Sequence, residues 1–275
     1  MKISITQSRY KKIFIILFWI LMWEIVALII NQEIYLPSPF STFKALYDLL
    51  FSKDTYITIL YSSYRTILGF LLSCFFGIIL GYFCGINSFM NNLFNPLISV
   101  MRTVPVMSII IIALLWFKDT NVPIFVAFLM CFPLIWTNTV IGIENTNIKL
   151  LQMCKIYNIK RLKIIKSIYL YSTLPHIKAG MISALGISWK VTSAAEVLSL
   201  PKYSIGRYLY DSKVYLEIPE LFAWTIIIVV LSFLFEKILS MLFEKRENWD
   251  DKIKQYFYKI WWLASFKRFQ HNIWW

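Results

Sequence analysis

Histidine is almost absent from this sequence, which has two among its 275 residues, and charged residues make up only 16% of it. A soluble domain is about a quarter charged. The four cysteines form no Cys-x-x-Cys pair, and His176 and His271 have no metal-site spacing with other ligand residues. The phosphate-binding pattern Gly-x-x-x-x-Gly-Lys-Ser/Thr is also missing. We therefore expect neither a metal site nor a nucleotide-hydrolysing loop in this chain.

Apolar residues dominate instead, at 59% of the sequence, with aromatic residues at 18%. Six apolar stretches are long enough for membrane helices, which need about 20 residues. They cover residues 13–30, 59–84, 97–117, 122–143, 179–198 and 221–243. Pro105 and Pro133 fall inside the third and fourth stretches, where neighbouring helices can satisfy the freed carbonyls. The sequence predicts an all-α polytopic membrane protein with six transmembrane helices.

The 28 basic and 15 acidic residues are distributed unevenly between the two sides of these helices. Residues 1–12, 144–178 and 244–275 carry four, seven and seven Lys or Arg, whereas residues 31–58, 118–121 and 199–220 carry two, one and three. Cytoplasmic loops carry the excess of basic residues in membrane proteins. This rule places both termini in the cytoplasm. A nucleic-acid-binding protein is the alternative for a basic chain, but no soluble segment here is longer than residues 144–178.

Four of the eight glycines lie in or at the ends of the second stretch: Gly69, Gly77, Gly81 and Gly85. The last three are four residues apart, so they share one helix face. Small residues at this spacing let two helix backbones approach closely. The face is either an ordinary packing surface or a surface on which two helices slide, and the sequence leaves both open.

Residues 144–178 are too polar to cross a membrane but are patterned like helices. Two apolar sets, one from Leu150 to Ile159 and one from Leu162 to Tyr169, predict two short helices with a break at Asn158. Asparagine enters the left-handed conformation more readily than other non-glycine residues, which suits a helix end. Such a pair on the inner membrane face would form a docking element.

This segment resembles the signature loop of ABC importer permeases, which reads Glu-Ala-Ala, three residues, Gly, nine residues, Ile-x-Leu-Pro. The spacing is kept by Gln152-Met153-Cys154, Asn158 and Ile168-Tyr169-Leu170-Tyr171, although most of the residues themselves differ. Further segments resemble the nitrate/sulfonate/taurine branch, and together they cover about residues 15–245. They are Leu36-Pro37-Ser38-Pro39, Ser63-Tyr64-Arg65, Arg102-Thr103-Val104-Pro105-Val106, Trp189-Lys190 and Ala194-Ala195-Glu196.

The resemblance implies a type I ABC importer permease fold in the plasma membrane of a prokaryote. Residues 1–58 would hold the first span and outer loop, 59–243 the permease core with coupling loop 144–178, and 244–275 a cytoplasmic tail. A second permease copy, forming a homodimer, would complete the translocation path. A substrate-binding protein would deliver the solute, and two separate ATPase subunits would bind ATP and magnesium. The permease itself would be no enzyme and would bind no cofactor.

The resemblance also assigns residues to the docking loop. The residues expected to contact the ATPase are Leu150, Leu151, Gln152, Cys154, Tyr157, Asn158 and Ile159. The solute is expected to be small and either anionic or vitamin-like, with sulfonates, nitrate and vitamin-type precursors all open. A non-transporting membrane scaffold and a membrane-embedded enzyme are the alternative functions.

Ionisable residues inside a membrane are functional candidates. Glu24, Arg102, Lys190 and Glu196 are therefore candidates for the translocation path. Lys190 lies near mid-membrane, where it could meet an anionic solute or pair with an acidic residue. Six residues at about 100° each place Lys190 and Glu196 about 120° apart on one helix, so they should not face each other. Arg65 and Glu196 lie near the membrane interface, where snorkelling or loop anchoring is the ordinary role for such residues.

The tail, residues 244–275, combines ten aromatic residues with seven Lys or Arg. Its apolar residues recur at helical spacing, which predicts an amphipathic helix on the inner membrane surface, in contact with lipid. An added contact with the ATPase is the alternative.

Overall fold

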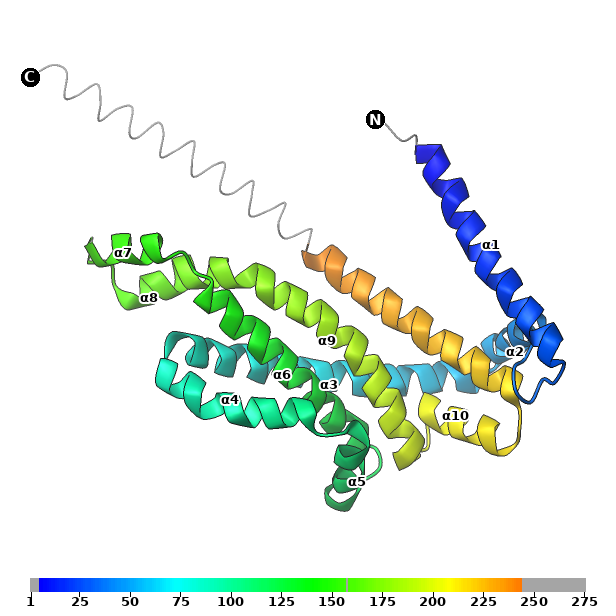
Figure 1. Cartoon of the computed structure of the whole chain (residues 1–275). Coiled ribbons are helices and arrows are strands. Elements are labelled where there is room, and N and C mark those ends of the chain that lie inside the picture. The colour runs from blue at the N-terminus through cyan, green and yellow to red at the C-terminus, as the bar shows by residue number, and fades with distance from the viewer. Residues whose placement is uncertain (1–4, 157, 244–275) are drawn as a thin grey trace, which may run out of the picture. The chain divides into compact units, whose positions relative to one another are not determined.

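A computed structural model describes residues 5–156 and 158–243, and within those ranges it contains helices and no strands. The elements are α1 Ile5–Ile30, α2 Pro39–Phe51, α3 Lys53–Ile86, α4 Ser88–Thr103, α5 Val106–Trp116, α6 Val122–Glu144, α7 Ile148–Ile156, α8 Arg161–Ile164, the π-helix η1 Ile165–Tyr169, α9 Leu170–Ser199, α10 Ile205–Val214 and a last helix Ile218–Phe243 (Figure 1). The chain divides into two compact units, Met1–Ser232 and Phe233–Trp275. The all-α prediction is confirmed for the described residues, and the predicted tail helix lies outside them.

Three of the described helices are long and apolar enough to cross a membrane on their own: α3, α6 and Ile218–Phe243. They contain the second, fourth and sixth predicted spans. The apolar part of α1, Phe14–Ile30, is shorter, and α9 is less apolar because it carries charged residues in its middle and near its end. A bent helix pair brings the number of spans by length and composition to at most four. The total of six spans stays a prediction.

The third predicted span, residues 97–117, is wrong as a single helix. The chain bends by 100° between α4 and α5, at Val104 and Pro105. Proline disfavours the helical conformation for the residue before it, and Val104 accordingly has an extended ψ of 129°. Pro96 and Pro133, by contrast, remain inside α4 and α6.

The core of the first unit is formed by α3, α6 and α9, which pack side by side (Figure 1). The glycine face of α3 lies directly on α6. A Cβ atom placed on Gly69 would lie 2.7 Å from Ala127 Cβ, and one on Gly81 would lie 2.8 Å from Thr139 Cβ. Both distances are shorter than real Cβ contacts, so only glycine fits. The predicted close approach of two helix backbones is confirmed.

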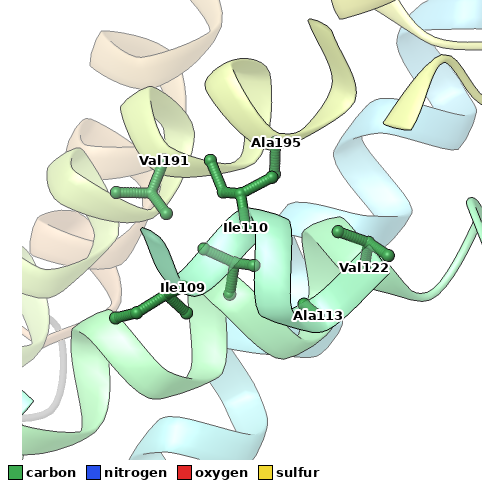
Figure 2. Close-up of a cluster of buried hydrophobic side chains, with 7 residues drawn as sticks. Ile109, Ile110, Ala113, Val122, Val191 and Ala195 are labelled. Atoms are coloured by element: carbon green, nitrogen blue, oxygen red, sulfur yellow. The ribbon is translucent and has the colours of Figure 1, made fainter. Parts of the chain in front are cut away.

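The bend at Pro105 folds α5 back against α6 and α9. Figure 2 shows the apolar cluster that results, which contains Ile109, Ile110, Ala113, Val122, Val126, Val191 and Ala195. Ile110 and Ala113 are completely buried in it. The end of α9 is thereby held on one side by α5 and α6.

The segment expected to dock, residues 144–178, breaks where the sequence predicts. The N–H of Ile159 donates to the carbonyl of Cys154 at 3.0 Å, and the N–H of Asn158 donates to that of Lys155 at 3.2 Å. These are the two bonds of a Schellman motif, and Asn158 takes its left-handed position with φ 48°. This asparagine therefore ends α7 and turns the chain sharply.

The second short helix of this segment is not a separate element. From Arg161 the chain continues through α8 and η1 into α9 without a break. No glycine or asparagine occurs between Asn158 and Gly180, so no residue there favours a left-handed stop. The second short helix predicted within residues 144–178 and the fifth predicted span, residues 179–198, therefore form one helical run from Arg161 to Ser199.

The α3–α6 contact gives a stability prediction. In Gly81→Val, the added side chain must push α3 away from Thr139 and from the Trp136 carbonyl. We expect the free energy of unfolding to fall by about 1–3 kcal/mol, measured as a lower melting temperature of the purified protein in detergent. Ala179→Val, on the exposed face of α9, is the control and should leave the melting temperature unchanged. Equal melting temperatures for both variants would contradict the tight packing.

Candidate functional site

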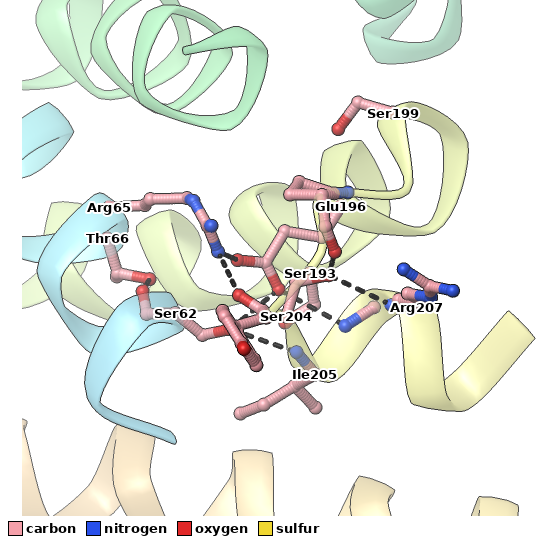
Figure 3. A network of polar contacts seen from close by, with 12 residues as sticks. Ser62, Arg65, Thr66, Ser193, Glu196, Ser199, Ser204, Ile205 and Arg207 are labelled. Atoms are coloured by element: carbon pink, nitrogen blue, oxygen red, sulfur yellow. Dashed lines mark hydrogen bonds and ion pairs between the residues drawn. The ribbon is translucent and has the colours of Figure 1, made fainter. Parts of the chain in front are cut away.

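A buried ion pair joins the first half of α3 to the end of α9 (Figure 3). Glu196, near the end of α9, has no exposed surface, and its Oε1 accepts a hydrogen bond from Arg65 Nη1 at 2.9 Å. Its other oxygen, Oε2, accepts from Ser62 Oγ at 2.8 Å and from the N–H of Gly206 at 3.1 Å. Both carboxylate oxygens are therefore satisfied, as a buried charge requires.

The same network organises the segment between α9 and α10. Arg65 also donates to the carbonyl of Tyr203 at 2.8 Å, and Ser62 Oγ accepts from the N–H of Ile205 at 2.9 Å. Ser204 caps α10 by accepting from the N–H of Arg207. Glycine is required at position 206, because a Cβ there would overlap that of Glu196. The charges on α3 and α9 thus anchor this loop and the start of α10.

Sequence reasoning placed Arg65 and Glu196 near one interface but did not pair them. The signal for this pairing in the sequence was the similar depth at which both residues are predicted to lie in the membrane. It also missed the Ser and Thr side chains buried on facing helices. On α3 these are Thr55, Thr58, Ser62 and Thr66, and on α9 they are Ser188, Thr192 and Ser199. Ser188 Oγ donates to the carbonyl of Thr66 at 3.2 Å, which links the two helices below the ion pair. Small hydroxyl residues in this position let helices pack closely in a membrane.

Lys190 lies on the opposite side of α9 from this network. Its side chain is exposed and forms no hydrogen bond or ion pair with residues 5–156 or 158–243. The residues exposed along the same face include Ala179 and Ser183, which are small. The acidic partners considered for Lys190 are elsewhere, because Glu196 is bound by Arg65 and Glu24 forms no ion pair within the described chain.

Arg102, the remaining path candidate, lies in the last turn of α4. Its side chain is exposed, and Nη2 lies 3.4 Å from the carbonyl of Pro133 on α6. Thr137 Oγ1 donates to the same carbonyl at 2.7 Å. In the part of the chain that the structure describes, Arg102, Lys190, Glu24 and Glu196 are not gathered into one site.

Helix α7, within the segment expected to dock, carries both buried and exposed apolar side chains. Cys154 is only 2% exposed, and Leu151 lines a cavity of about 650 Å³ together with Ile164 and Tyr169. Four large apolar side chains of α7 are exposed: Ile148, Leu150, Met153 and Ile156. Leu150 lies one turn from Cys154 on the same side, and Ile156, on another side, is 79% exposed. Among the other residues expected to dock, Gln152 and Asn158 are exposed, Ile159 is half-buried and Tyr157 lies outside the described residues.

Comparison with known proteins identifies relatives of one kind. Residues 77–247 match the family model described as "Binding-protein-dependent transport system inner membrane component". The putative aliphatic sulfonates transport permease protein of Bacillus subtilis is 26% identical over 84% of both chains. A nitrate import permease protein of Synechococcus elongatus is 29% identical over 70% of this chain and 72% of its own. A bicarbonate transport system permease protein of the same organism is 26% identical over 72% and 74%.

The ion pair gives a stability prediction: removing a buried charge should lower the free energy of unfolding more than removing an exposed one. Glu196→Gln keeps the size of the side chain but leaves Arg65 as a buried charge without its counter-ion. We expect the free energy of unfolding to fall by about 3–5 kcal/mol, seen as a lower melting temperature in detergent. Asp211→Asn is the control, because its 3.6 Å pair with Arg207 is 41–45% exposed and should contribute less than about 1 kcal/mol. A similar small loss in both variants would show that the Glu196 charge is dispensable.

Proposed function

Because this chain belongs to the family of binding-protein-dependent transport system inner membrane components, we propose that two copies of it form the translocation path of one ABC importer. The match over residues 77–247 carries this proposal, since it extends from the middle of α3 to beyond the last described residue. The relatives are permeases, so the scaffold and membrane-enzyme alternatives have no support. The chain is the membrane permease of such an importer.

The proposed assembly follows from this role. The two permease copies act with two separate ATPase subunits, which bind ATP and magnesium, and with a substrate-binding protein on the outside. Each copy has six membrane spans in a type I fold, with both termini in the cytoplasm. The bent pair α4 and α5 takes the place of the third span. The excess of basic residues in residues 1–12, 144–178 and 244–275 supports this orientation.

The docking surface for the ATPase is the exposed apolar face of α7. We assign it to Ile148, Leu150, Met153 and Ile156, because exposed large apolar side chains on a cytoplasmic helix favour burial against a partner. Cys154 and Leu151 face the permease itself and are packing residues. The Schellman motif at Asn158 holds α7 at a fixed angle to the helix that follows. ATP binding closes the ATPase pair and thereby shifts the population of permease conformations.

The solute is a small anion. The relatives named for aliphatic sulfonates, nitrate and bicarbonate all concern anions, and vitamin-type precursors have no such support. Lys190 is the residue suited to meet the anion, because it is an exposed cation near mid-membrane on a face not packed against α3 or α6. Glu196 is not part of the path in this proposal. Its carboxylate is fully used by Arg65, Ser62 and Gly206, and it anchors the outer loop.

The docking face can be tested by charge substitution. Ile156→Glu places a carboxylate in the contact with the ATPase. We expect it to reduce the ATPase that co-purifies with the co-expressed permease by about tenfold or more, because an unpaired buried charge is costly. Asn145→Glu, an exposed site just before α7, is the matched control and should retain the ATPase. Full retention by Ile156→Glu would rule out this face.

The role of Lys190 can be tested by transport. Two unit charges 4 Å apart attract by about 4 kcal/mol at an effective dielectric constant of 20. We therefore expect Lys190→Met to lower the initial uptake rate by about tenfold or more in proteoliposomes that contain the whole importer. Lys190→Arg should preserve uptake, and Lys44→Met, an exposed lysine on α2, serves as the control.

The uptake probes are an alkanesulfonate, nitrate and bicarbonate. An unchanged rate in Lys190→Met for the transported anion would remove Lys190 from the path.

A further inference from the structure

The π-helix η1 lies at the junction between the docking segment and the helix that carries Lys190. It covers Ile165–Tyr169, between α8 and α9, and the N–H of Leu170 donates to the carbonyl of Ile165 five residues earlier. An α-helix would use the carbonyl four residues earlier. A single π turn is rare and often marks a functional position. Any displacement of α7 that travels along the chain to α9 must pass through this turn.

A tyrosine on α3 holds the turn in place. Tyr82 donates its hydroxyl to the same Ile165 carbonyl at 3.0 Å. Tyr82 is fixed in turn, because its neighbour Gly81 and the nearby Gly85 pack without clearance on Thr139 and Ile143 of α6. The hydroxyl therefore ties η1 to the most rigid contact of the core.

Apolar packing does not restrain η1 in the same way. Ile165 is half-buried, and three pockets that open to the surface, of about 290, 650 and 660 Å³, have it in their walls; two of them also border Tyr82 and Phe83. The side chain of Ile165 thus has space to move, and the Tyr82 hydroxyl is the specific contact that fixes the turn.

We propose that Tyr82 is a positioning residue for energy coupling. Its hydroxyl holds η1 in the π register, and its release lets the turn shorten to the α register. A change of one residue corresponds to a shift of about 1.5 Å and a rotation of about 100° between α8 and α9. The docking segment would pass its movement to α9, and so to Lys190, by this step rather than by bending. The inference rests on the proposed docking of α7 to the ATPase.

The first test removes the hydroxyl alone. Tyr82→Phe keeps the ring and deletes the hydrogen bond, and Tyr171→Phe is the control, because Tyr171 is exposed on the same helical run. The whole importer is reconstituted with its binding protein, and both the ATP hydrolysis rate and the uptake of the transported anion are measured. We expect Tyr82→Phe to retain the ATPase subunit but to lower the number of anions imported per ATP by roughly 2- to 10-fold, the range expected for one hydrogen bond.

The second test changes the register directly. Deleting the exposed Ser167 removes one residue from η1 and leaves an α-helical turn. This variant should lower the import per ATP to a similar extent. Adding Tyr82→Phe to the deletion should then have little further effect, because the hydroxyl no longer holds a π turn. If the deletion does not fold, hydrogen exchange at the Leu170 amide in Tyr82→Phe takes its place and should become faster.

The outcomes separate this inference from the proposed function. Loss of the ATPase from the Ile156→Glu complex supports the docking face. A Tyr82→Phe complex that retains the ATPase but imports fewer anions per ATP supports the role of Tyr82. An intact Tyr82→Phe complex with normal import per ATP overturns the role of Tyr82 and leaves the docking face untouched. An additive effect of the deletion and Tyr82→Phe would overturn the register change.

Discussion

The direct contact between α3 and α6 is the constraint on which the other contacts depend. Gly69, Gly77, Gly81 and Gly85 leave no room for side chains between these helices, so neither helix can move without separating from the other. The rigid pair then serves as a frame. In the first half of α3, Arg65 holds Glu196, and near the end of α3 Tyr82 holds the carbonyl of Ile165. The helical run from η1 to Ser199 is thus fastened to one helix at two widely separated points.

Between these two points the contact is polar and adaptable. Ser62 and Ser188 bond across to the other helix, whereas other hydroxyl residues of α3 and α9 bond to carbonyls of their own helix, as Thr66 does to Ser62 and Ser199 does to Ala195. Such bonds survive a small relative movement of the helices, whereas apolar interdigitation would oppose it. The arrangement combines firm attachment at the ends of α9 with a middle that tolerates displacement. A transporter that alternates between two conformations needs both properties.

Sequence patterns predicted the elements that depend on local chemistry. The glycine spacing on α3 specified a close helix contact, because only one residue type permits it. Asn158 specified a helix end, because few residues adopt its backbone conformation. The bend at Pro105 was misjudged, since a proline inside an apolar run is compatible with both a continuous and a broken helix. Its outcome depends on the packing of α5 against α9, which is a tertiary contact.

The face of α7 proposed to dock shows a second limit of sequence-based prediction. Helical periodicity identified residues of α7 that share a face, such as Leu150 and Cys154, but periodicity does not say which neighbour a face meets. Because α7 is apolar on more than one side, the predicted docking set includes both Leu150, which is exposed, and Cys154, which is buried. Likewise, Arg65 and Glu196 pair across a separation of 131 residues, which no local pattern encodes.

That separation has a consequence for biosynthesis. Chains grow at about 5–20 residues per second, so the ribosome adds Arg65 roughly 7–26 s before it adds the counter-ion Glu196. During this interval the arginine must rely on water or lipid headgroups, and a chain truncated before residue 196 never receives its permanent partner.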